Sequence, residues 1–109
     1  MKILLDENIP IAIKKEFSSN HITLTVRDMN WLGKKNGELL RLLIQEKFDI
    51  LITIDKNLSK QQHLLQINLK IFVLNAPDNK IATLKPFIEE IIKPFYSSVK
   101  NGVTEIKLS

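Results

Sequence analysis

Hydrophobic and polar positions follow two different periods along the chain, which predicts strands separated by helices. Short apolar runs at 2–5, 49–54 and 70–74 are typical of strands buried on both faces of a sheet. Between 22 and 27, apolar and polar residues alternate, which predicts a strand with one polar face at or near a sheet edge. A terminal strand is expected at 103–108, with its alternate apolar residues facing the core.

The segments between these strands carry apolar residues at helical spacing. We expect a helix that follows Asn8, which would cap it, and a second helix capped by Asn36. A short helix is expected around 60–66. The apolar residues from 84 to 95 predict a long final helix, with Pro86 near its start, where proline is tolerated.

This alternation predicts a compact three-layer α/β fold, with a mostly parallel sheet flanked by helices and one short terminal edge strand. We expect residues 1–109 to form a single domain. Only the terminal strand is a candidate for antiparallel pairing. Ligands of such folds bind outside the carboxyl ends of the strands, where the strand order reverses.

Two acids are expected at that edge, because Asp6 follows the first strand and Asp55 follows the apolar run at 49–54. Two neighbouring carboxylates repel one another unless a proton or a cation separates them. Oxygen ligands favour Mg²⁺ or Mn²⁺, and phosphodiester hydrolysis is the chemistry that fits such a site. Glu38, in the first turn of the second helix, is the third candidate. Each acid also has a structural explanation, as a cap or turn residue for the two aspartates and as a favourable helix-start charge for Glu38.

Composition narrows the possible chemistry further. The 109 residues include no cysteine, which excludes disulfides, thiolate metal sites and a cysteine nucleophile. The formal net charge of +4 permits a polyanionic partner without requiring one. The apolar run at the N-terminus is too short for a signal peptide, and no run reaches the ~20 residues of a membrane span. We therefore expect a cytoplasmic protein that does not enter the membrane.

Four segments have the order and spacing of motifs found in a known family. They are 2–10 (KILLDENIP), 25–28 (TVRD), 33–40 (GKKNGELL) and 48–58 (FDILITIDKNL), followed by Gln61 and Gln62. Over residues 1 to about 95 the chain resembles a family of short bacterial PIN-like proteins, a compact variant of the PIN nuclease domain.

The resemblance implies a metal-dependent ribonuclease that acts as the toxin of a type II toxin–antitoxin pair. It implies that Asp6, Glu38 and Asp55 are the catalytic and metal-binding acids, with Mg²⁺ or Mn²⁺ as the cofactor. RNA is then the substrate and an antitoxin protein the cognate partner.

The sequence departs from the family at Asn57, where many relatives have a further acid. An amide there weakens metal binding and allows a degenerate site. Asp28, Asn75, water or the substrate phosphate could complete such a site. Glu7 and Asn8 belong to the same opening motif as Asp6 and are secondary candidates, although Asn8 is equally explained as a helix cap and Glu7 as a first-turn acid.

Several basic and amide side chains are expected near the acids, where they could bind RNA. These candidates are Lys34, Lys35, Lys56, Lys60 and Gln61. Ordinary solvated side chains are the alternative explanation for all of them.

Two other functions fit parts of the pattern. A receiver-like phosphoacceptor domain also uses an acidic pair after its first strand and an aspartate after its third, as Asp6, Glu7 and Asp55 could supply. It needs a hydroxyl after the fourth strand, where this chain has Asn75, and a lysine after a fifth parallel strand. The other alternative is a catalytically degenerate module that binds a protein partner. A homodimer through the edge strand or the last helix is possible in either case.

Overall fold

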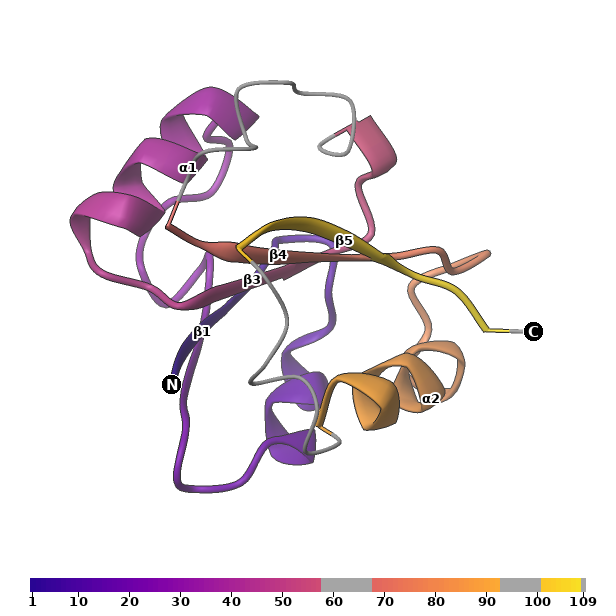
Figure 1. Ribbon diagram of the computed structural model, residues 1–109. Helices are drawn as coiled ribbons and strands as arrows, with labels where there is room; N and C mark the ends of the chain where they lie inside the picture. Colours follow the sequence, from indigo (N-terminus) through magenta and orange to yellow (C-terminus); the bar gives the residue numbers. More distant parts are fainter. Residues whose placement is uncertain (58–67, 93–100, 109) are drawn as a thin grey trace.

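A computed structural model of the protein describes residues 1–57, 68–92 and 101–108. Five strands form one sheet in the order β2-β1-β3-β4-β5, and each neighbouring pair is parallel (Figure 1). The strands are β1 (Lys2–Leu5), β2 (Ile22–Thr25), β3 (Ile50–Thr53), β4 (Lys70–Leu74) and β5 (Gly102–Ile106). The helices are η1 (Ile11–Glu16), a 3-10 helix, with α1 (Asn36–Gln45) and α2 (Ile81–Ile92).

The sheet lies between two helical layers, so the predicted three-layer α/β architecture is confirmed (Figure 1). One face is covered by α1, whose buried residues Leu39, Leu40 and Leu43 pack with Leu4 and Leu51 of the central strands. The other face is covered by η1 and α2, which contact each other and pack over alternate residues of the same strands. Successive residues of the fully buried strand β3 therefore belong to opposite cores, as in a sheet covered on both sides.

The strand order has a switch point between β1 and β3. From β1 the chain moves outward to β2, returns past β1 to form β3, and then moves outward on the other side to β4 and β5. This is the Rossmann-like layout in which a crevice opens at the carboxyl ends of the two strands where the direction changes. The first and third strands are therefore the ones whose ends position a site.

The terminal strand differs from the expectation in two respects. β5 is parallel to β4, not antiparallel, because α2 lies between the two strands and a helical crossover joins parallel neighbours. β5 ends at Ile106, so Leu108, which was expected to face the core, lies beyond the strand and is exposed. The prediction that this strand lies at the sheet edge is confirmed.

Three local predictions are wrong. Asn8 does not cap a helix, because Pro10 holds an extended conformation and η1 begins only at Ile11. Asn36 is the first residue of α1 and not its cap, a position that Lys35 occupies without a side-chain hydrogen bond. Pro86 lies inside α2, five residues after its first residue.

The edge strand β2 also buries its residues differently from the predicted pattern. Its edge position is confirmed, but Ile22 is exposed while the side chain of Thr25 is buried. The short helix expected at 60–66 and the end of the long helix beyond Ile92 lie outside the described residues. Among the described helices, none is both long and apolar enough to cross a membrane.

Candidate functional site

Two of the three predicted acids lie together at the switch point. Asp6 directly follows β1, and its backbone N–H donates to the carbonyl oxygen of Ile52 in β3 at 3.0 Å. Asp55 lies two residues beyond the end of β3. Since β1 and β3 are parallel neighbours, their carboxyl ends meet at one edge and bring the two carboxylates there.

A buried threonine joins the two acids. The hydroxyl of Thr53, the last residue of β3, donates to Asp6 Oδ2 at 2.7 Å. The same hydroxyl oxygen accepts the backbone N–H of Asp55 at 3.0 Å. Because Thr53 is fully buried, water does not compete for these contacts. The threonine thus fixes the position of both acids with a single side chain.

The carboxylate of Asp55 is held at both oxygens. Oδ1 accepts the backbone N–H of Asn57 at 2.9 Å, which closes a tight turn of the kind that aspartate favours. Oδ2 accepts a hydrogen bond from Nδ2 of Asn36 at 3.2 Å, so the first residue of α1 reaches across to the end of β3. Asn36 is therefore directed to the acids rather than to the start of its own helix.

Burial dominates the electrostatics of Asp6. Its side chain is only 8% exposed, and the removal of water raises the pKa of this carboxyl above its ordinary value. The hydrogen bonds from Thr53 and from the Glu7 backbone N–H, the latter 2.8 Å long, act in the opposite direction. The negative charges of Glu7 and Asp55 add to the increase. Asp6 is thus a carboxyl whose ionised form is costly unless a positive charge lies nearby.

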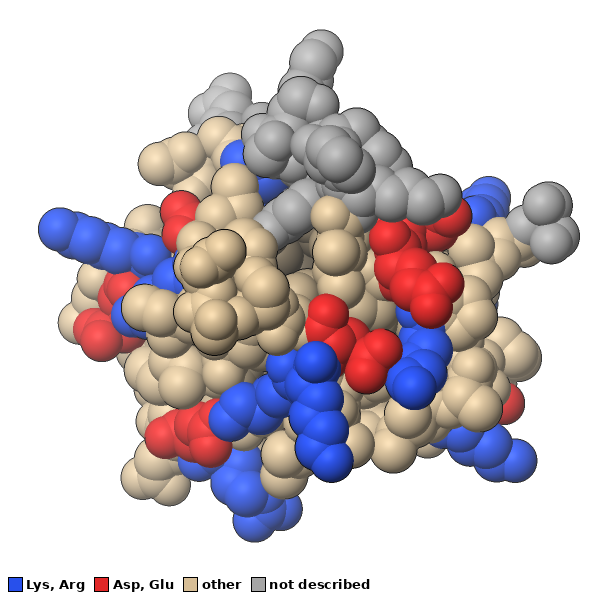
Figure 2. Space-filling view, turned by 90° about the horizontal axis from the view of Figure 1, so that it is seen from below, with Lys and Arg blue, Asp and Glu red and all other residues tan. Residues whose placement is uncertain are grey.

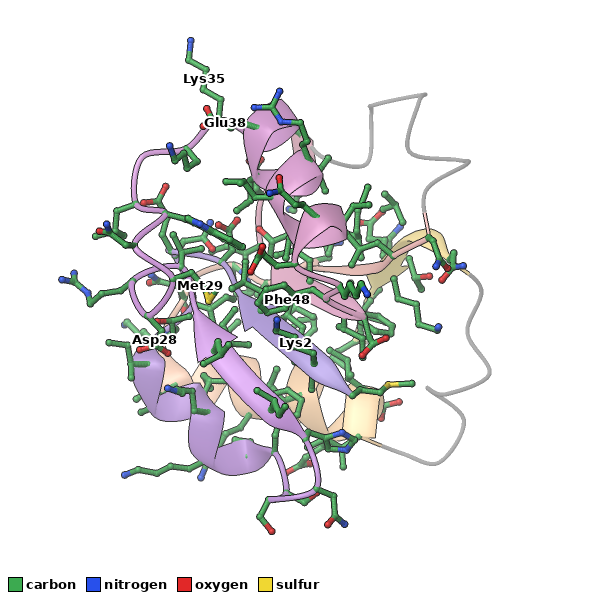
Figure 3. The ribbon with its side chains drawn as sticks, turned by 90° about the vertical axis from the view of Figure 1, so that its left-hand side faces the viewer. Lys2, Asp28, Met29, Lys35, Glu38 and Phe48 are labelled. Atoms are coloured by element: carbon green, nitrogen blue, oxygen red, sulfur yellow. The ribbon has the colours of Figure 1, made fainter. Side chains whose placement is uncertain are left out.

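The third predicted acid lies apart from this pair. Glu38 forms an ion pair with Lys34 at 2.9 Å, and its side chain is 42% exposed. The hydrogen bond and positive charge of Lys34 lower the pKa of Glu38. Figure 3 shows Glu38 and Lys35 together at the outer end of α1. Across residues 1–57, 68–92 and 101–108, no three His, Cys, Asp or Glu side chains come together as ligands for a metal ion.

The secondary candidates have varied surroundings. Asp28 accepts from Lys14 at 2.8 Å and from the backbone N–H of Thr25 at 2.9 Å, and the contact with Lys14 is the main cause of its lowered pKa. Its position beside η1 is visible in Figure 3. Asn75 donates its backbone N–H to Ile106 at 2.9 Å, a contact that continues the pairing of β4 with β5.

Asn8, Glu7 and Asn57 remain close to the acids along the chain. Oδ1 of Asn8 is buried and has no hydrogen-bond partner among the described residues. Glu7 and Asn57 contribute backbone N–H groups to Asp6 and Asp55 respectively.

The predicted RNA-binding lysines divide into three cases. All three lysines at 34, 35 and 56 are exposed; Lys34 is paired with Glu38, and Lys56 directly follows Asp55. Lys60 and Gln61 lie outside the described residues. Figure 2 views the face covered by η1 and α2, on which basic and acidic side chains are interspersed and form no single basic patch.

A cleft of about 370 Å³ lies at the opposite end of the sheet, between the end of α1 and the starts of β3, β4 and β5. Lys47, Asp49 and Lys70 are among its lining residues. The acids at the switch point are therefore not inside this cleft. We place the candidate site at the acids because Asp6 is buried, has a raised pKa and lies beside a second carboxylate.

Comparisons of the chain with protein-family models, with curated proteins and with solved structures gave no match. The candidate site residues therefore rest on their geometry alone.

Two residues of the candidate site were not predicted from the sequence: Thr53, and Asn36 in its contact with Asp55. Thr53 had a signal, since it is the one hydroxyl in the apolar run at 49–54. Asn36 had none, because an amide before a helical segment is adequately explained as a cap.

Proposed function

We propose that this protein is a metal-dependent ribonuclease with a PIN-like fold, in which Asp6 and Asp55 bind Mg²⁺ or Mn²⁺. The observation that carries the proposal is the pairing of these two acids at the switch point through the buried hydroxyl of Thr53. A cation between them would offset the burial and the like charge that raise the pKa of Asp6.

The donor set fits a hard divalent cation. The side-chain groups at the site are the carboxylates of Asp6 and Asp55, the amide of Asn36 and the hydroxyl of Thr53. Mg²⁺ is typically held by one or two carboxylates and keeps several waters, with substrate phosphates as further ligands. Two carboxylates at the carboxyl edge of a parallel sheet are sufficient for this kind of site.

When bound, such an ion supplies an activated water and stabilises the negative charge that develops on the scissile phosphate. The residues of the chain perform the remaining tasks. Thr53 holds the carboxylate of Asp6 in a single orientation, and the turn at Asn57 does the same for Asp55. The positive charges of the exposed residues Lys35 and Lys56 attract the RNA backbone.

The resemblance to the PIN-like family supports two partners beyond RNA. A toxin of this kind is neutralised by a cognate antitoxin, which we propose as the protein partner. A homodimer is proposed through an edge of the sheet, since β2 and β5 are the outermost strands among the described residues.

A catalytically degenerate module that binds a protein partner is the second candidate function. The observation that favours it is the ion pair of Glu38 with Lys34, since among the described residues no group of three acids comes together at the site. The amide at Asn57 points in the same direction. This candidate predicts a folded protein that cleaves no RNA.

A receiver-like phosphoacceptor is the third candidate, and the topology favours it more than the sequence did. β5 is a fifth parallel strand, and Lys107 follows it at the edge that carries Asp6 and Asp55. Against it, Asn75 stands where a hydroxyl is needed, and both carboxylate oxygens of Asp55 accept hydrogen bonds. Stable labelling of Asp55 by acetyl phosphate would favour this candidate over the nuclease.

The test of the nuclease is a parallel measurement of Mn²⁺ binding by calorimetry and of cleavage of a mixed single-stranded RNA pool. The variants are Asp6→Asn and Asp55→Asn, with Glu46→Gln as the matched control, because Glu46 is exposed beyond the C-terminal end of α1. We expect Mn²⁺ binding and RNA cleavage to be lost in Asp6→Asn and Asp55→Asn and retained in Glu46→Gln. Metal binding without cleavage by the wild type favours the degenerate module, and the absence of both rejects the metal site.

A further inference from the structure

The amide of Asn36 makes an unusual contact for the first residue of a helix. Such residues commonly leave their side chains in solvent, whereas Asn36 is partly buried and reaches Asp55, 19 positions along the chain, at 3.2 Å. The N-cap position of α1 is occupied by Lys35, and no side chain caps the helix, so the amide of Asn36 does not act as a cap. Its side chain donates a hydrogen bond to the carboxylate of Asp55 instead.

The chemistry of the two groups fixes the orientation of the amide. An ionised carboxylate has only acceptors, so the nitrogen of Asn36 must face Asp55 and its carbonyl oxygen must point elsewhere. Asp55 is then held by Asn36 at one oxygen, by Asn57 at the other, and by Thr53 at its backbone N–H. Thr53 and Asn57 are each two residues from Asp55 in the sequence. Of the three contacts, only the hydrogen bond from Asn36 joins Asp55 to α1.

Glu38 provides the contrast within the same helical turn. Its side chain is 42% exposed and is paired with Lys34. No hydrogen bond or ion pair among the described residues joins it to Asp6 or Asp55. The link between α1 and the two acids is therefore the amide of Asn36, and not the carboxylate of Glu38 that the sequence indicated.

We propose that Asn36 is a positioning residue, which orients the carboxylate of Asp55 for the bound cation, and that Glu38 is not required. This inference rests on the proposed function for its metal. Residues that orient a metal ligand by hydrogen bonding typically contribute ~10-fold to 100-fold in metal affinity.

The test compares Asn36→Ala with Glu38→Ala, since both truncate a side chain in the first turn of α1. Mn²⁺ affinity is measured by calorimetry, and amide hydrogen exchange is measured by NMR on the metal-free proteins. We expect Asn36→Ala to weaken Mn²⁺ binding about 10-fold and to speed exchange at the Asn57 N–H, which depends on the position of Asp55. Glu38→Ala should change neither value.

A purely structural role for Asn36 gives a different result. It would speed exchange at Leu39, whose N–H bonds to Lys35 in the first turn, and leave Asn57 unchanged. That pattern, or equal Mn²⁺ affinity in Asn36→Ala and wild type, overturns the proposal. If the wild type binds no Mn²⁺, the metal site itself is rejected, and the exchange rate at Asn57 alone decides whether Asn36 positions Asp55.

Discussion

The hydroxyl of Thr53 donates to Asp6 Oδ2 at 2.7 Å, although the two residues lie 47 positions apart in the chain. The contact joins the carboxyl ends of β1 and β3, the two strands at which the order of the sheet reverses. One buried hydroxyl therefore links the stability of the sheet to the geometry of the candidate site.

Replacement of Thr53 by valine should reveal this link. Thr53→Val keeps the shape but leaves a carboxylate oxygen and a backbone N–H without their partner, since Thr53 serves both Asp6 and Asp55. We expect the free energy of unfolding to fall by about 2 kcal/mol, which is typical of a hydrogen bond to a charged group. Urea denaturation at pH 7 measures the change.

Thr53→Ser is the matched control, because it retains the hydroxyl and removes only a methyl group. It should cost less than Thr53→Val and preserve Mn²⁺ binding. If valine is tolerated as well as serine, the hydroxyl does not hold the two acids.

Asp6 should make stability depend on pH in a particular direction. Its folded-state pKa is raised mainly by burial, so the folded protein binds more protons than the unfolded chain between the two pKa values. This contribution to stability is complete below the unfolded pKa of about 4 and is lost as pH rises through the raised folded pKa.

The measurement is urea denaturation from pH 3 to pH 8 in EDTA, for wild type and Asp6→Asn. Asp28 and Glu38 have lowered pKa values and act in the opposite direction, so only the difference between the two proteins isolates Asp6. We expect the stability of wild type to decrease relative to Asp6→Asn as pH rises. A difference that stays constant over this range contradicts the prediction.

The proline within α2 provides a test of the fold that is independent of the site. Pro86 is exposed, lies in the helix interior and lacks the N–H that would bond to the carbonyl of Ala82. Proline is about 3 kcal/mol less favourable than alanine in a helix interior, and the greater freedom of the unfolded alanine chain offsets up to about 1 kcal/mol of this difference. Pro86→Ala should therefore raise the free energy of unfolding by about 2 kcal/mol. Lys85→Ala, also exposed on α2, is the control and should change stability little.

Lys47, which follows the C-terminal end of α1, is a second position at which a substitution tests the fold independently of the site. Its φ of 59° lies in the left-handed region, and its N–H and that of Phe48 bond back to Ile44 and Leu43 in the manner of a helix end usually occupied by glycine. Lys47→Gly should stabilise the protein by about 0.5 kcal/mol, as measured by thermal unfolding. Glu46→Gly, at an ordinary φ of −88°, should have the opposite effect.

The sequence predicted the strands well where burial alone determines the pattern. β3 and β4 are continuous apolar runs covered on both faces, so their positions follow from hydrophobicity. The convergence of Asp6 and Asp55 followed from parallel geometry, in which strand ends of the same kind meet at one edge.

What failed was decided by contacts distant in sequence. The direction of β5 depends on the crossover that precedes it and not on its own alternation of residues. Asn36 has the chemistry of a cap, but a carboxylate on another element competes successfully for its amide. By contrast, the ion pair of Glu38 with Lys34, four residues earlier, is a local contact that the motif did not predict.

The position of β3 beside β1 has a consequence for the order of events during synthesis. A growing chain that ends before Thr53 contains Asp6 but neither the strand nor the hydroxyl that holds it. The carboxylate pair cannot assemble until the central strand has been made and has docked against the first, which requires closure of a long loop. An emerging chain of this protein thus lacks the candidate carboxylate pair until β3 and Asp55 have been synthesised, and a partner that captured β1 or β3 before they paired would prevent its assembly.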